Sequence, residues 1–212
     1  MNAKEYIFGN SRMYEKIFKR WFDFVFSLLL LIVAAIPMVI VAIGIKSTSK
    51  GPVLFRQKRY GVGSKPFVFY KFRSMSVDAP IISALDGHEK LEKHITPLGS
   101  FLRASSIDEL PQLFNILMGQ MSFIGPRPLA ETDIKTLKLR KKFGADKVKP
   151  GISGLAQVSG RNSVDAVKKA EYDYCYAKRV SFLFDARLVL LTVYTVIKHT
   201  GINAGEGGTD EQ

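Results

Sequence analysis

The sequence predicts a mostly helical α+β protein that is attached to a membrane by its N-terminal part. Residues 25–45 (VFSLLLLIVAAIPMVIVAIGI) carry no charge, and the stretch is long enough for one membrane helix. Residues 51–70 alternate turn residues with β-branched and aromatic ones, as in a short β-hairpin. We therefore expect an N-terminal segment 1–46 with the membrane helix Val25–Ile45, a domain over 47–200 and a flexible tail over 201–212.

Composition narrows the classes of partner. The 212 residues include 31 Lys and Arg against 19 Asp and Glu, a formal net charge of +12. This surplus favours an anionic partner, which is a nucleic acid, a phospholipid surface or a phosphorylated substrate. The single cysteine, Cys175, excludes a disulfide within the chain, and three scattered histidines give no zinc pattern. The soluble part therefore fits a reducing compartment.

The flanks of the apolar segment bear on its topology. A secretory signal peptide is the weaker reading, because the segment is long for one and no A-x-A-like site follows. Positive charge next to a membrane segment prefers the cytoplasm, so a simple crossing violates this preference at one end. Pro37 favours a bend. A re-entrant helix kinked at Pro37 satisfies both observations, and an ordinary kinked spanning helix remains the alternative. The basic residues lie on both sides: Arg12, Lys16, Lys19 and Arg20 before the segment, and Lys46, Lys50, Arg56, Lys58 and Arg59 after it.

The remaining elements follow from pattern and turn residues. Residues 61–65 (GVGSK) resemble part of a phosphate loop but lack the glycine spacing of a Walker motif. The C-terminal apolar helix is shorter than a typical span, so we expect it to pack on the domain or lie in the membrane interface. We expect a polar loop with a short helix over 78–94, a helix over 110–118, an amphipathic helix with a basic face over 131–143, a loop or short strands over 148–162, and helices over 164–178 and 182–198.

The stretch SSIDELPQLFN (residues 105–115) places two carboxylates before an apolar helix. Ser106 and Glu109 match a capping box, but Pro111 then falls beyond the first turn and removes a helical hydrogen bond. With Asp108 as the cap, Pro111 lies where the backbone donor is unpaired anyway, so we expect Asp108 to cap the helix. Such a carboxylate stays ionised, and an ionised pair is also what a nucleophile or a magnesium site needs.

Several basic residues have the placement expected of phosphate ligands. Arg127 lies between two prolines (GPRPL), which hold it in an extended and nearly fixed backbone. A strand over YKFRSM places Lys71 and Arg73 on one face, where two cations repel unless an anion lies between them. Arg103 precedes the acidic pair by five residues. We therefore expect Lys71, Arg73, Arg103 and Arg127 to bind phosphate groups.

These motifs together resemble a known family. The order of KRWFDF, the apolar run with its central proline, KFRSM, SSIDELPQLFNILMGQMSFIGPRPL and KPGISGLAQVSGRN resembles the bacterial sugar transferases, which are monotopic phosphoglycosyl transferases. The resemblance covers residues 13–198. It implies transfer of a sugar-1-phosphate from a UDP-sugar to undecaprenyl phosphate, with release of UMP, on the cytoplasmic face of the bacterial inner membrane.

The resemblance also assigns roles to residues. It implies that Asp108 attacks phosphorus and forms a covalent phosphosugar intermediate in a ping-pong reaction. Glu109 would help hold the Mg²⁺ cofactor together with Asp108. Lys71, Arg103 and Arg127 would lie near the phosphates, and the membrane helix would be re-entrant, breaking near Pro37.

Two departures and three rival functions accompany this reading. Ile36 stands where relatives often have serine, and Leu155 stands where they often have tryptophan. The main alternative is a non-enzymatic basic membrane adaptor that binds anionic lipid and has no special need for Asp108. A membrane-tethered nucleic-acid binder lacks a reader motif, so we expect no nucleic acid. A phosphohydrolase would use the same acids with water as the acceptor.

Overall fold

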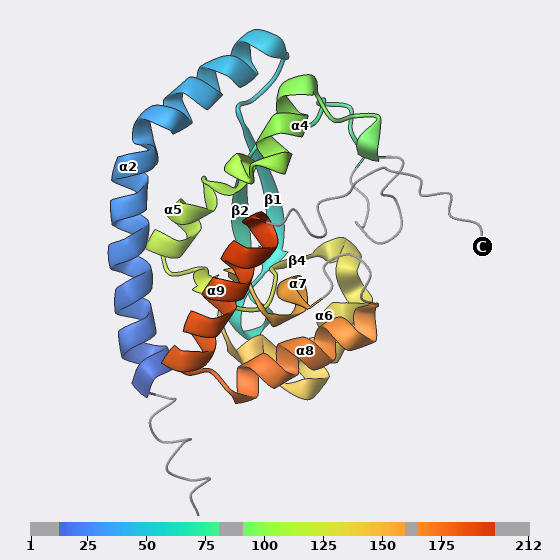
Figure 1. The fold of residues 1–212 in the computed structure, drawn as a ribbon. Coiled ribbons are helices and arrows are strands. Elements are labelled where there is room, and N and C mark those ends of the chain that lie inside the picture. Colours follow the sequence, from blue (N-terminus) through green and yellow to red (C-terminus); the bar gives the residue numbers. More distant parts are fainter. Residues whose placement is uncertain (1–12, 81–90, 160–164, 198–212) are drawn as a thin grey trace, which may run out of the picture.

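The computed structural model describes residues 13–80, 91–159 and 165–197, and it confirms a mostly helical α+β fold (Figure 1). The tail predicted over 201–212 and most of the loop predicted over 78–94 lie outside the described residues. The helices are α2 (Lys19–Thr48), α4 (Pro97–Ala104), α5 (Gln112–Leu117), α6 (Ile134–Phe143), α7 (Leu155–Val158), α8 (Ala166–Lys178) and α9 (Phe182–Ile197), with a π-helical turn η1 (Tyr14–Phe18) before α2. Short 3₁₀ turns are η2 (Val62–Ser64), η3 (Ile107–Glu109), η4 (Glu131–Asp133) and η5 (Ala145–Lys147).

A three-stranded antiparallel sheet forms the centre of the domain. Strands β1 (Leu54–Tyr60) and β2 (Pro66–Phe72) make the predicted hairpin. The two-residue strand β4 (Leu129–Ala130) joins the other edge of β1, where Arg59 pairs with Ala130. A separate parallel pair consists of β3 (Ser122–Ile124) and β5 (Gly151–Ser153). The sheet therefore connects the hairpin to the segment that contains Arg127.

The parallel pair requires close contact between two backbones. A Cβ atom on Gly151 would lie 2.1 Å from the backbone nitrogen of Gly125, and a Cβ atom on Gly125 would lie 2.2 Å from the carbonyl oxygen of Lys149. Any side chain at these positions would force the two segments apart. The glycine-rich stretch 148–162, predicted as a loop or short strands, thus contributes β5 and the short helix α7.

The long helix α2 runs along one side of the domain and changes direction partway along its length (Figure 1). Pro37 lies within it, where a proline removes one helical hydrogen bond. Almost none of its most apolar stretch is buried, and Ile32, Val33 and Ile36 are each more than 60% exposed. By length and composition the helix is able to cross a membrane, and its exposed apolar face supports membrane association.

Both ends of α2 are attached to the same domain. Near its C-terminal end Ile45 is buried in a cluster with Phe72 and Leu102. Near its N-terminal end Asp23 Oδ1 accepts hydrogen bonds from Ser122 Oγ at 3.0 Å and from the Phe123 backbone nitrogen at 3.2 Å. A straight helix of 30 residues would be about 45 Å long. Both of its ends are nevertheless anchored to one body, which includes β2 and β3.

A buried ionic group strengthens the N-terminal attachment. Lys19 forms an ion pair with Asp185 of α9, and both side chains are nearly inaccessible to solvent. The hydroxyls of Tyr14 and Tyr176 donate to the same carboxylate at 2.9 Å and 2.8 Å. Charges removed from water must be compensated by partners of this kind. This network joins α2, α8 and α9 into one unit.

Three helices complete the C-terminal half. The predicted helices over 131–143, 164–178 and 182–198 correspond to η4 with α6, to α8 and to α9. Helix α9 buries Asp185 and Leu188 against the domain, whereas Leu183 and Leu190 are 79% and 71% exposed. An outward apolar face on a short helix is typical of a membrane-interface helix.

Candidate active site

The two adjacent acids lie in a tight turn rather than at the start of a long helix. Asp108 and Glu109 belong to the 3₁₀ turn η3, which follows the exposed helix α4 and precedes α5. The prediction that Asp108 caps the following helix is wrong, because Pro111 occupies the cap position of α5 and no side chain caps it. Ser106 adopts a left-handed backbone with φ of 58°, and this sharp turn carries the chain into η3. Asp108 is therefore available for other contacts.

Lys71 connects the two acids. Its Nζ atom donates to Asp108 Oδ2 at 3.3 Å and to Glu109 Oε1 at 2.7 Å. Lys71 lies on β2 one residue before Phe72, which is buried in the core. Successive side chains of a strand point to opposite faces, so packing of Phe72 on one face presents Lys71 on the other. Lys71, predicted to bind phosphate, thus lies in contact with both acids, and its phosphate role stays a prediction.

The two carboxyl groups have opposite electrostatic environments. Burial raises the pKa of Asp108, the adjacent charge of Glu109 raises it further, and the charges of Lys71 and Arg103 oppose this rise. For Glu109, burial also favours the neutral acid, but the charges of Lys71 and Arg127 outweigh it and hold the pKa below its usual value. Separation of two neighbouring carboxyls in this way is typical of sites that assign them different roles.

Arg103 and Arg127 supply positive charge from two different parts of the chain. Arg103, in the last turn of α4, is exposed and its charge acts on Asp108. Arg127, between β3 and β4, is also exposed and its charge acts on Glu109. The charges of two of the predicted arginines therefore act on the acids, one on Asp108 and one on Glu109.

The sequence reasoning did not single out Arg59 for this site. Its guanidinium lies 5.2 Å from the ring centre of Phe69 and donates to the Pro128 carbonyl at 3.0 Å. Burial and the nearby charge of Arg127 lower the pKa of Arg59 to about 10, so it stays charged near neutral pH. Strand alternation was the signal for it, because Arg59 pairs with Phe67 and so shares a face of the hairpin with Lys71.

Arg73 lies elsewhere. It follows the end of β2, is buried, and donates through NH2 to the Ser49 carbonyl at 2.9 Å and to Ser49 Oγ at 2.6 Å. Ser49 ends helix α2, where a positive charge is favourable. The structure gives Arg73 no contact with the acids, and its predicted phosphate role stays a prediction.

The carboxylate oxygens of Asp108 and Glu109 are ligands of the type that magnesium prefers. Among the described residues there is no group of three or more His, Cys, Asp or Glu that could hold a metal ion. Magnesium is usually bound by one or two carboxylates, with substrate phosphates and water completing its shell. The pair of Asp108 and Glu109 fits that pattern and does not fit a metal site built from protein alone.

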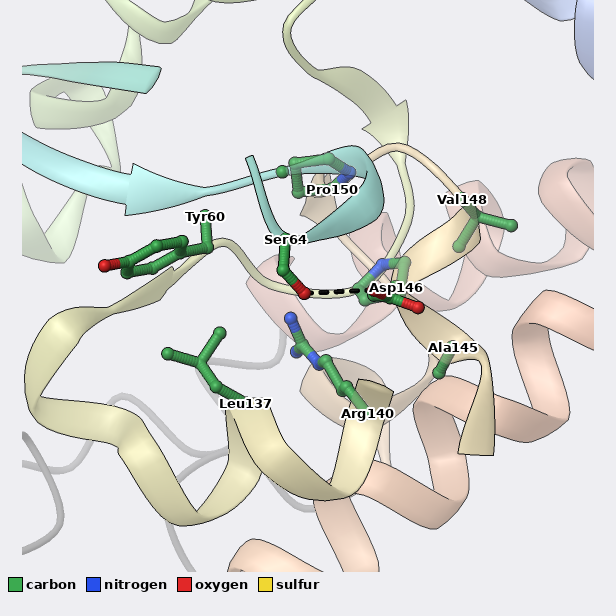
Figure 2. Close-up of a pocket in the computed structure, with 10 residues that line it drawn as sticks. Tyr60, Ser64, Leu137, Arg140, Ala145, Asp146, Val148 and Pro150 are labelled. Atoms are coloured by element: carbon green, nitrogen blue, oxygen red, sulfur yellow. Dashed lines mark hydrogen bonds between the residues drawn. The ribbon is translucent and has the colours of Figure 1, made fainter. Parts of the chain in front are cut away.

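A pocket lies near the hairpin turn (Figure 2), and neither Asp108 nor Glu109 is among the residues that line it. It lies between the turn after β1 and helix α6, and Ser64 Oγ there donates to Asp146 at 3.0 Å. The GVGSK loop thus contacts a carboxylate, an unfavourable neighbour for phosphate. The residues that line the pocket are Tyr60, Gly61, Ser64, Pro126, Leu137, Arg140, Ala145, Asp146, Val148 and Pro150.

Comparison with known proteins relates this chain to sugar transferases. The family described as bacterial sugar transferase matches residues 14–199. A UDP-glucose:undecaprenyl-phosphate glucose-1-phosphate transferase of Klebsiella pneumoniae is 43% identical over 188 residues, which is 84% of this chain and 40% of that protein. An undecaprenyl-phosphate galactose phosphotransferase of Salmonella typhimurium is 35% identical over 201 residues, which is 88% of this chain and 42% of that protein.

A shorter relative matches along nearly its whole length. It is an uncharacterized sugar transferase, EpsL, of Bacillus subtilis, and it is 37% identical over 199 residues, 92% of this chain and 95% of that protein. The chain spans only about two fifths of the length of the Klebsiella and Salmonella relatives. The match nevertheless includes the acids, Lys71 and Arg127 within one continuous region. The chain belongs to the bacterial sugar transferase family.

Proposed function

We propose that this protein transfers a sugar-1-phosphate from a UDP-sugar to undecaprenyl phosphate and releases UMP, which starts a glycan on its lipid carrier. The observation that carries this proposal is the buried carboxylate of Asp108, held beside Glu109 by Lys71. The printed names of the relatives from Klebsiella and Salmonella support the two substrates.

The reaction proceeds in two displacements at one phosphorus atom. A carboxylate oxygen of Asp108 attacks the phosphorus that bears the sugar, a new O–P bond forms, and the bond to the UMP oxygen breaks. UMP leaves with the bonding electron pair, and the sugar phosphate remains on Asp108. A phosphate oxygen of undecaprenyl phosphate then attacks the same phosphorus and displaces the carboxylate. The covalent step allows two anionic substrates to react in turn.

The neighbouring residues supply positive charge and orientation. The charge of Lys71 opposes the rise in the pKa of Asp108 that burial causes, and Arg103 and Arg127 contribute further positive charge for the phosphates. Asp108 and Glu109 would hold Mg²⁺ together with the donor phosphates. When bound, Mg²⁺ neutralises charge that develops on the phosphoryl oxygens and on the leaving UMP.

The membrane arrangement follows from the attachment of α2. Because both ends of α2 contact one domain, we propose that α2 is re-entrant, that it bends at Pro37 and that it leaves the membrane on the side where it entered. Basic residues flank both ends, and this supports a proposed location of the domain at the cytoplasmic face of the bacterial inner membrane. The exposed apolar face of α9 lies in the interface.

We predict that Asp108→Asn lowers UMP release at least about a thousandfold, because an amide is not a nucleophile toward phosphorus. The assay uses full-length protein in detergent with Mg²⁺, a panel of UDP-sugars and undecaprenyl phosphate. Glu171→Gln, an exposed acid on α8, is the matched control and should keep wild-type rates. Near-normal turnover of the Asp108 variant would show that Asp108 is not the nucleophile. Absence of UMP release by the wild-type protein would favour the non-enzymatic adaptor, and UMP release that ignores the lipid acceptor would favour a hydrolase.

We predict that Lys71→Met shifts the acidic limb of the pH–rate profile toward higher pH. Asp108 must be ionised to attack, and the charge of Lys71 opposes the rise in its pKa, so removal of that charge raises the pKa further. The maximal rate should also fall by about a hundredfold. The measurement is kcat/KM as a function of pH, from about pH 5 to about pH 9. A profile with an unchanged acidic limb contradicts this role of Lys71.

We predict that residues before and after α2 lie on one side of the membrane. Lys16→Cys and Lys50→Cys, each in a Cys175→Ser background, should react with an impermeant thiol reagent only from the cytoplasmic side of vesicles. Exposed Cys175 in the unaltered chain reports the side of the domain and serves as the reference. Labelling of positions 16 and 50 from opposite sides would show an ordinary spanning helix.

A further inference from the structure

The backbone that carries Arg127 is held by donors from four other parts of the chain. The Arg127 side chain is exposed, but the residues on both sides of it are buried. Pro126 and Pro128 have no N–H group, so this segment has few hydrogen bonds of its own to fix it. The carbonyl of Ile124 accepts from Tyr176 Oη at 3.1 Å, that of Pro126 from the Gly151 nitrogen at 2.9 Å, that of Arg127 from Arg140 at 2.8 Å, and that of Pro128 from Arg59 at 3.0 Å.

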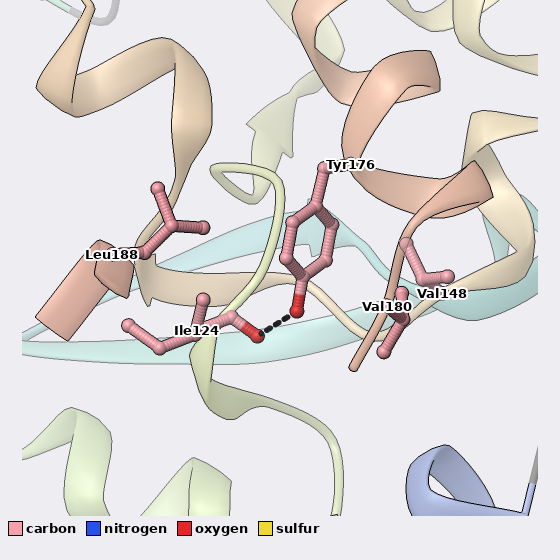
Figure 3. Packing of buried hydrophobic residues seen from close by; sticks show 5 residues of the cluster. All are labelled: Ile124, Val148, Tyr176, Val180 and Leu188. Atoms are coloured by element: carbon pink, nitrogen blue, oxygen red, sulfur yellow. Dashed lines mark hydrogen bonds between the residues drawn. The ribbon is translucent and has the colours of Figure 1, made fainter. Parts of the chain in front are cut away.

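The first of these contacts is part of the core. Tyr176 extends from α8 toward the Ile124 carbonyl, among the apolar side chains of Val148, Val180 and Leu188 (Figure 3). Tyr176 is 1% exposed, so the beginning of the Arg127 segment is anchored in the interior. Secondary structure and core packing fix this end of the segment. The carbonyls of Arg127 and Pro128 depend instead on two arginine side chains.

Arg140 makes the contact to Arg127 itself, and it is ion-paired. Its NH1 atom donates to the Arg127 carbonyl, and its Nε atom donates to Asp173 Oδ2 of α8 at 2.6 Å. Arg140 and Asp173 are only 6% and 1% exposed. A planar guanidinium with one edge fixed by a carboxylate has little freedom at the other edge. Asp173 therefore sets the direction in which Arg140 meets the Arg127 peptide.

Stability alone explains this pair poorly. Burial of two charges costs much of what their attraction returns, and apolar side chains of similar volume in such places are often equally stabilising. The Arg140–Asp173 pair also contacts the backbone of the exposed Arg127, so we look for its role in the placement of Arg127. The charge of Arg127 is close enough to Glu109 to influence its ionisation, so the position of this peptide matters at the acids.

We propose that Arg140, oriented by Asp173, is a positioning residue that fixes the Arg127 peptide so that the Arg127 guanidinium meets the donor phosphates beside Glu109. Arg59 acts in the same way one residue later, through the Pro128 carbonyl. The inference rests on the proposed function, in which Arg127 binds those phosphates. Arg140 and Asp173 are both buried, so in this proposal they act on the donor through Arg127 and not by direct contact.

The test begins with a variant that removes the whole pair. In Arg140→Met with Asp173→Leu no buried charge is left alone, so thermal unfolding should change little, while the Arg127 carbonyl loses its donor. We expect kcat/KM for the UDP-sugar to fall about tenfold, since small displacements of a phosphate ligand reduce rates strongly. Lys141→Met, at an exposed position on α6, is the control and should keep the wild-type value. If the pair variant does not fold, Arg140→Lys replaces it.

A double-mutant cycle separates positioning from a purely structural role. If Arg140 acts through Arg127, the pair variant should cost much less in an Arg127→Ala background, about twofold rather than tenfold. An equal loss in both backgrounds would overturn the proposal, as would wild-type kinetics of the folded pair variant.

Amide hydrogen exchange provides a readout that does not need turnover. Exchange of the peptide covering residues 122–130 should be faster in the pair variant than in Lys141→Met, because the segment opens more readily. Unchanged exchange there would overturn the positioning of Arg127 even if no UDP-sugar were turned over. Absence of turnover by the wild-type protein, with faster exchange in the variant, would count against the proposed function and leave the positioning supported.

Discussion

The proposed active site depends on the contact between Lys71 and the two acids. Adjacent carboxylates repel each other, and burial makes the charge on Asp108 more costly. Lys71 reaches both side chains, at 3.3 Å and 2.7 Å, and supplies the positive charge that makes the pair tolerable as anions. In the proposed reaction the donor phosphates approach this same cation. Stabilisation of the anionic pair and attraction of the donor would then both come from Lys71.

The fold links this contact to the helix that is able to enter a membrane. Lys71 is fixed by the hairpin, whose Phe72 packs against Ile45 of α2 and Leu102 of α4. The end of α2 and the position of Lys71 are thus set by one apolar cluster. At the other end of α2, the buried pair of Lys19 with Asp185 joins the helix to α9. An anchor held at both ends has a defined depth, and we propose that this depth matches the phosphate of the lipid acceptor.

The sequence predicted several elements and residues of the site, and it missed one local turn and one contact between distant residues. The hairpin, the apolar helix and the proximity of Lys71, Arg103 and Arg127 to the acids came from local pattern and family resemblance. The cap assigned to Asp108 was wrong because the left-handed turn at Ser106 was not visible in the pattern. Arg140 and its partner Asp173 are 33 residues apart, and only the packing of α6 on α8 brings them together.

Intact-protein mass spectrometry with the donor alone tests the central claim most directly. Full-length protein with Mg²⁺ and the UDP-sugar that supports turnover, but without undecaprenyl phosphate, should gain the mass of one sugar phosphate. Fragmentation should locate it on Asp108, and addition of the lipid acceptor should remove it. Absence of any adduct at residue 108, under conditions where the complete reaction runs, would contradict covalent catalysis by this carboxylate.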